Sequence, residues 1–74
     1  MGHPHVSPVG RTGRLVTATR GTDGPGEVLV AIRGGTETFL ARSAAPLSKG
    51  QTVLCVEELD HRSVFVEPWA EPTV

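Results

Sequence analysis

Few side chains in this 74-residue sequence are of types that catalyse reactions. Asp60, His61 and Arg62 form an acid–base triplet, but they fall between two apolar runs, where a solvated turn is the stronger interpretation. Ser48 and Lys49 resemble half of a Ser–Lys dyad, yet a loop with Gly and Pro supplies neither an oxyanion hole nor a buried lysine. We therefore expect no catalytic residues in these segments and no enzymatic activity.

Cys55 is the single cysteine and lies in the apolar run Val53–Val56. Thiolate chemistry needs a lowered pKa, whereas an apolar strand raises the pKa of a thiol, so we interpret Cys55 as a small buried hydrophobe. A single cysteine excludes an internal disulfide bond and favours a cytoplasmic setting. His3 and His5 lack the third converging ligand that a metal site needs. We expect no metal site and no cofactor.

Overall charge and hydropathy exclude further classes of protein. Lys and Arg number 7 against 8 Asp and Glu, for a net charge of -1, whereas a general nucleic-acid binder needs a basic surface. The glycine-rich segment 20–26 lacks the Lys-Ser or Lys-Thr pair of a phosphate loop, so we interpret it as a connection between strands. No stretch approaches the roughly 18 apolar residues of a membrane span.

Five short apolar segments must position the remaining side chains. The sequence is rich in Val and Thr, which favour strands, and in Gly and Pro, which interrupt them. The dipeptide Gly34-Gly35 predicts a type I′ or II′ hairpin turn between the second and third segments. Segment 43–50 contains Pro46, so it predicts one helical turn or an irregular crossing. The predicted strands cover 13–19, 27–33, 36–42, 51–58 and 63–67.

This order of elements predicts an all-β fold, a five-stranded OB-fold barrel of Greek-key topology. An SH3-like barrel is the main alternative, but the longer crossing between the third and fourth strands favours the OB fold. We expect a flexible, disordered N-terminal lead-in at 1–8, the barrel at 9–68 and a C-terminal tail at 69–74. The predicted interior consists of Leu15, Thr17, Val28, Val30, Phe39, Ala41, Val53, Cys55, Val64 and Val66.

Several outward-facing side chains are of the types that dominate protein interfaces. Exposed aromatic residues and arginines are the usual centres of such contacts. Leu29 and Leu40 are expected to share an apolar patch on adjacent strands, suited to a partner or to homo-oligomer contacts. The predicted contact surface consists of Leu40, Phe65 and Trp69, rimmed by Arg33 and Arg42.

The same residues leave a second class of function open. OB barrels bind single-stranded nucleic acid by combining basic side chains with aromatic stacking platforms. Phe65 and Trp69 are the candidate platforms. The basic side chains that would accompany them are Arg11, Arg14, Arg20, Arg33 and Arg42. The near-neutral net charge argues against this alternative, and also against a translation-associated, S1-like domain.

Short motifs at the predicted strand ends resemble the C-terminal domain of the NfeD family. They are Gly10–Gly13, Gly26–Val28, Ala41–Ser43, Lys49–Val53 and Val64–Pro68, within residues 9–68. The resemblance implies a non-enzymatic OB-fold module that binds a flotillin/stomatin-like scaffold protein at the inner face of the membrane. Family members commonly carry transmembrane helices ahead of the barrel, and longer ones a Ser–Lys protease domain; this sequence matches neither. We therefore expect membrane contact only through a partner or a removed anchor.

Overall fold

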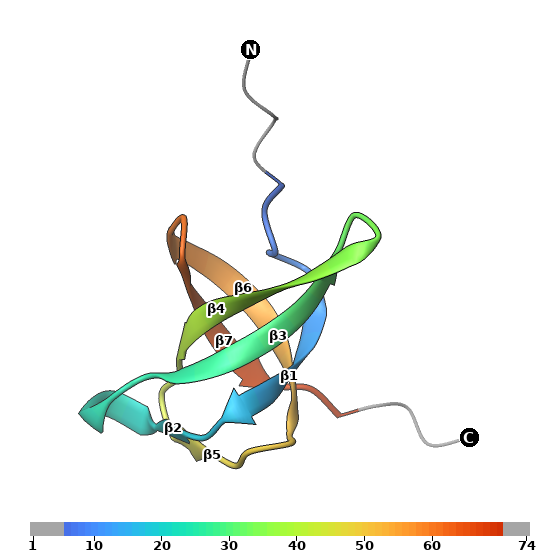
Figure 1. The fold of residues 1–74 in the computed structure, drawn as a ribbon. Coiled ribbons are helices and arrows are strands. Elements are labelled where there is room, and N and C mark those ends of the chain that lie inside the picture. Colours follow the sequence, from blue (N-terminus) through green and yellow to red (C-terminus); the bar gives the residue numbers. More distant parts are fainter. Residues whose placement is uncertain (1–5, 71–74) are drawn as a thin grey trace.

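The computed structural model describes residues 6–70 of the chain. Its residues form an all-β fold with a single 3-10 turn, η1 (Figure 1). In chain order the elements are β1 (Thr12–Thr17), β2 (Thr19–Arg20), η1 (Gly21–Asp23), β3 (Gly26–Ile32), β4 (Gly35–Arg42), β5 (Pro46–Leu47), β6 (Thr52–Asp60) and β7 (Ser63–Pro68).

Five strands close into a barrel in the order β1-β3-β4-β7-β6. Neighbouring strands are antiparallel except β4 and β7, which are parallel. This closure is the Greek-key arrangement of an OB fold, so the predicted fold class is confirmed. The five predicted strands correspond to the five barrel strands, and their ends differ by at most two residues.

The barrel interior is filled by apolar side chains from alternate positions of the five strands. Nine of the ten predicted interior residues are buried, and Ile32 and Leu47 join them. Each buried Val or Leu contributes roughly 1.5–3 kcal/mol, which in a domain this small must offset most of the chain entropy. The core residues are Leu15, Val28, Val30, Ile32, Phe39, Ala41, Leu47, Val53, Cys55, Val64 and Val66.

Thr17 is the exception, and its predicted place in the interior is wrong. Leu15 pairs with Val28 while Thr17 pairs with Glu27, so Val16 is an extra residue in β1. A β-bulge of this kind shifts the inward–outward alternation by one position. Thr17 is therefore exposed, and its hydroxyl donates a hydrogen bond of 2.8 Å to Glu27 Oε1.

The hairpin between β3 and β4 turns one residue earlier than predicted. Its two central residues are Arg33 and Gly34, with φ of 50° and 77°, while Gly35 already pairs with Ile32 in the ladder. Two consecutive positive φ values are the mark of a type I′ turn, which confirms the predicted turn class. The placement at Gly34-Gly35 is wrong. The sequence indicates the two glycines because glycine tolerates a positive φ, whereas Arg33 occupies the first left-handed position.

The lower end of the barrel is closed by a small sheet of β2 and β5 (Figure 1). Segment 43–50 thus forms an irregular crossing with a short strand, and the alternative of a helical turn is wrong. Pro46 explains this, because the residue before a proline is held in an extended conformation. Thr19 Oγ1 accepts a 2.9 Å hydrogen bond from the Leu47 N–H and lies 2.6 Å from Ser43 Oγ, and all three residues are buried.

At the upper end the barrel strands separate into two hairpins. β7 pairs with β4 only through residues 40–42, so residues 35–39 of β4 extend beyond the start of β7. Figure 1 shows the tip of the β3–β4 hairpin (green) well apart from the tip of the β6–β7 hairpin (orange). The molecule therefore has a sealed lower half and an open upper half.

The chain on either side of the barrel stays close to it where it is described. Val6 packs against the core and Pro8 is buried, while the Trp69 N–H donates a 3.1 Å hydrogen bond to Thr52 O. Residues 1–5 and 71–74 lie outside the described residues. The predicted boundaries at residues 8 and 68 stay predictions.

Candidate binding surfaces

The parallel pairing of β4 with β7 brings together three of the five predicted contact residues. Arg42 is the register partner of Phe65, and Leu40 is the register partner of Ser63. Ala41 and Val64, the pair between them, point into the core. Leu40, Arg42 and Phe65 therefore face outward. Leu40 is 45% exposed, Arg42 is exposed and Phe65 is half-buried. We call these three residues the β4–β7 surface.

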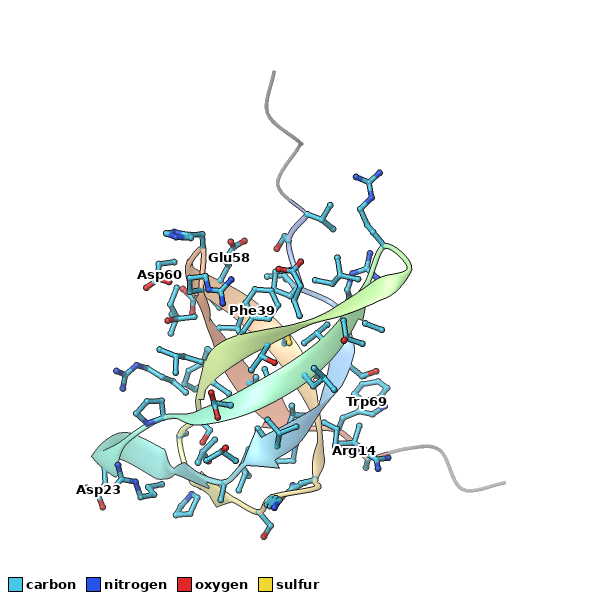
Figure 2. The ribbon with its side chains drawn as sticks, viewed as in Figure 1. Arg14, Asp23, Phe39, Glu58, Asp60 and Trp69 are labelled. Carbon is cyan, nitrogen blue, oxygen red and sulfur yellow. The ribbon has the colours of Figure 1, made fainter. Side chains whose placement is uncertain are left out.

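Trp69 and Arg33 lie away from this surface. The main chain of Trp69 is bonded to Thr52, which is the register partner of Arg14 in β1, and Figure 2 shows Trp69 and Arg14 on one side of the molecule. Arg33 is at the tip of the β3–β4 hairpin, seven positions along the chain from Leu40. The predicted single contact surface is therefore divided over three places, although the contact role of each residue stays a prediction.

Leu29 and Leu40 are both exposed on adjacent strands, as the alternation predicts. Leu29 is the partner of Thr38 and Leu40 the partner of Glu27, so the two leucines are diagonal neighbours. Diagonal neighbours in an antiparallel pair are about 7–8 Å apart, which is within reach of long side chains. The apolar part of the β4–β7 surface can thus continue onto β3.

The structure also has a groove on the outer face of β1, β3, β4 and β6 that the sequence analysis does not predict. It encloses about 330 Å³ beside Arg14. A sequence signal for it is the small Ala31 at an outward position, which leaves space between longer neighbours. Gly13 also belongs to its wall, and a Cβ there would come within 2.7 Å of Leu29 O. The groove is lined by Thr12, Gly13, Arg14, Leu29, Ala31, Thr36 and Thr52.

The polar residues of the β6–β7 turn stabilise the turn itself. Asp60 Oδ1 accepts a hydrogen bond of 2.8 Å from the Arg62 N–H. This bond is the main reason that the pKa of the Asp60 carboxyl lies below its ordinary value, with smaller contributions from Ser63 and His61. His61 and Arg62 are exposed. The predicted solvated turn is what the structure shows.

Cys55 and Lys49 do not share a site with each other or with the residues of the β6–β7 turn. Cys55 is fully buried in the core, and burial raises the pKa of its thiol, so the unreactive protonated form is favoured. Lys49 lies in the turn before β6, at the opposite end of that strand from His61. Residues 6–70 contain no group of three side chains that could hold a metal ion, and His3 and His5 lie outside the described residues.

The structure first defines a class of protein, a small closed β-barrel of the OB type. A family model, the NfeD C-terminal domain, matches residues 12–67. The chain therefore belongs to the NfeD C-terminal domain family.

Among solved structures, the chain is similar to the solution structure of the soluble domain of the NfeD protein YuaF from Bacillus subtilis. The two are 38% identical with a TM-score of 0.67, and the match covers 80% of this chain and 70% of that one. No curated protein matches the chain. Within residues 6–70 there is no helical segment with the length and hydrophobicity needed to span a bilayer.

Proposed function

We propose that this chain is a non-enzymatic protein-interaction module that binds a flotillin/stomatin-like scaffold protein at the inner, cytoplasmic face of the membrane. The observation that carries the proposal is the β4–β7 surface, where an exposed leucine, a half-buried phenylalanine and an arginine lie on adjacent strands. Aromatic and arginine side chains at the centre of a patch supply much of the free energy of protein binding, and an exposed leucine beside them adds apolar area that binding would bury. Membership of the NfeD C-terminal domain family supports the same reading.

The absence of enzymatic activity is part of this proposal. Of the candidate catalytic side chains, Cys55 is buried in the core, whereas Lys49 and His61 lie at opposite ends of β6. A nucleophile and a base must lie within hydrogen-bonding reach of each other to act together. Cys55, Lys49 and His61 do not meet that condition.

The proposal is tested by measuring binding to a purified flotillin/stomatin-like protein encoded in the same genome. Leu40→Ser in the β4–β7 surface is expected to weaken binding about tenfold, because a central apolar contact is lost. Val16→Ser is the matched control, since Val16 is 40% exposed on β1, away from that surface. Equal affinities of the two variants, or no saturable binding of the unsubstituted chain, would contradict the proposal.

Single-stranded nucleic-acid binding is the second candidate function. It is favoured by the groove beside Arg14, with the half-exposed indole of Trp69 on the same side (Figure 2). It predicts retention on a single-stranded oligonucleotide column that falls steeply between low and moderate salt, and that is lost in Trp69→Ala. Such retention, together with no binding of the scaffold protein, would replace the first proposal by the second.

A further inference from the structure

The upper half of β4 carries main-chain groups that point away from its neighbour β3. Ile32 and Gly35 flank the two-residue turn and so form a hydrogen-bonded pair. In an antiparallel ladder, every second residue from that pair onward bonds to the neighbouring strand. The N–H and C=O groups of Thr36, Thr38 and Leu40 therefore face the other side of β4.

Leu40 confirms that these main-chain groups point away from β3, because its N–H donates a 2.8 Å hydrogen bond to Arg62 O. β7 begins at this level and does not extend along residues 36–38, and no residue in the described range 6–70 bonds to the outward main-chain groups of Thr36 and Thr38. Thr36 is exposed and Thr38 is half-buried. We call residues 36–38 the open edge of β4.

A hollow lies at the lower end of the open edge. It encloses about 280 Å³ at the place where β4 and β7 begin to pair. Leu40 gives it an apolar wall that is 45% exposed. An apolar side chain from a strand added along the open edge would rest there. The hollow is lined by Glu27, Thr38, Phe39, Leu40 and Arg62.

The charge of Glu37 decides whether the strand that pairs with the open edge comes from a second copy of this chain or from another protein. In a two-fold antiparallel pairing of two open edges, Thr36 of each copy would bond Thr38 of the other, and Glu37 would face Glu37. Such a pair has Cα atoms only about 4.5 Å apart, and directly opposed like charges are destabilising. Glu37 is exposed. Glu37 therefore disfavours pairing of the open edge with the same edge of a second copy. It favours a partner strand that places a Lys or Arg opposite it.

We propose that the open edge of β4 binds an extended segment of a partner protein as an added antiparallel strand. Thr36 and Thr38 supply the main-chain hydrogen bonds, a Lys or Arg of the segment lies opposite Glu37, and apolar residues on either side of it pack outward toward Leu40. Strand addition at an unpaired edge is a recurrent way of recognising peptides. This inference rests on the proposed protein-binding role and adds the chemistry of the bound segment.

The test uses a synthetic seven-residue peptide with capped ends and Val-Lys-Val at its centre, titrated into the whole chain. Saturable changes are expected in the NMR signals of the Thr36 and Thr38 amides, with hydrogen exchange of both slowed at least about tenfold at saturation. The same peptide with Val-Glu-Val at its centre is expected to bind about fivefold more weakly. Glu37→Lys is expected to reverse that preference.

Thr38→Pro removes one N–H from the open edge and leaves the β3–β4 hydrogen bonds in place, because Thr38 bonds outward. It is expected to abolish peptide binding. Thr38→Val keeps the N–H and is the matched control, expected to bind as the unsubstituted chain does. The amide signals of core residues such as Val28 and Val53 report in each variant that the barrel has folded.

Absence of saturable shifts at Thr36 and Thr38 with both peptides would overturn the inference, as would equal binding by Thr38→Pro and Thr38→Val. Concentration-dependent dimerisation through the same amides would overturn it in favour of a second copy. Failure here is distinguishable from failure of the proposed function. Loss of scaffold binding in Leu40→Ser but not in Thr38→Pro would leave the β4–β7 surface as the binding site and exclude the edge.

Discussion

The two halves of β4 have the same neighbour on one side and different surroundings on the other. Residues 40 and 41 lie between β3 and β7, and Ala41 is fully buried. Residues 36–38 have only β3 beside them, and Glu37, at an inward position of the same alternation, is exposed. The barrel thus seals its core where each strand has two partners, and leaves main-chain groups available for binding where a strand has one.

The largest expected effect concerns the sealed half. Val53→Ala removes two methyl groups from a fully buried side chain and leaves a cavity, which should lower the free energy of unfolding by about 2–3 kcal/mol. For a domain of this size that is a large part of the total stability. Urea denaturation measures it, with Val16→Ala as an exposed control expected to change stability by less than about 0.5 kcal/mol. Equal losses of stability in Val53→Ala and Val16→Ala would contradict the view that the sealed half carries the stability of the barrel.

The next effect concerns the closure below the barrel. Thr19→Val deprives the buried Leu47 N–H of its acceptor and should cost about 1–3 kcal/mol. Thr17→Val is the control, because Thr17 is exposed and its hydroxyl bonds only the exposed Glu27. Thermal unfolding of both variants is the measurement. A larger loss from Thr17→Val would show that the bulge of β1, and not the β2–β5 sheet, holds the lower half closed.

A smaller, stabilising effect is expected at the tip of the open half. Arg33 has φ of 50°, a left-handed conformation that Asn adopts more readily, and Asn-Gly is the preferred type I′ pair. Arg33→Asn should therefore raise the free energy of unfolding by up to about 1 kcal/mol. Gly34→Ala, at φ of 77°, should lower it. The two are compared by urea denaturation, and a destabilising Arg33→Asn would argue against the type I′ turn.

The smallest effect is a pH dependence in the β6–β7 turn. The pKa of Asp60 is lowered in the folded chain, chiefly by its hydrogen bond from the Arg62 N–H. A carboxyl with a lowered folded pKa stabilises the fold at pH values above its unfolded pKa, and that contribution disappears as the pH falls through the folded pKa. Asp60→Ala should thus be slightly less stable than the unsubstituted chain at pH 6, with the difference vanishing at low pH.

Denaturation midpoints at pH 6 and at pH 2 measure this difference. Asp23→Ala, which removes an exposed carboxylate of η1, is the comparison variant. A constant difference between Asp60→Ala and the unsubstituted chain at both pH values would show that the carboxylate charge has no part in the turn.

Alternation of apolar residues predicts the strands and nearly all of the core, because a barrel strand must place every second side chain inside. The same pattern cannot fix the β3–β4 register. Pairing Phe39 with Val30 or with Val28 keeps all three side chains inside, and the structure has the second. The bulge at Val16 is likewise invisible in the sequence, and it places Thr17 outside.

The candidate site is predicted less completely than the fold. That Leu40 and Trp69 are exposed follows from alternation and from the flanking prolines, and the structure agrees. Which of these residues share a surface depends on how the barrel closes. Because β4 meets β7 in parallel, Arg42 lies beside Phe65, whereas Trp69 continues past the pairing toward Arg14. Such long-range adjacency has no local signal.

Native-state hydrogen exchange along β4 tests the account most directly, because both proposals depend on where this strand has one neighbour and where it has two. The amides of Glu37, Phe39 and Ala41 bond to β3, and that of Leu40 bonds to Arg62, so these four should exchange slowly. Those of Thr36 and Thr38 should exchange near the rate of an unprotected amide. Protection of Thr36 and Thr38 equal to that of Glu37 and Phe39 would contradict the account.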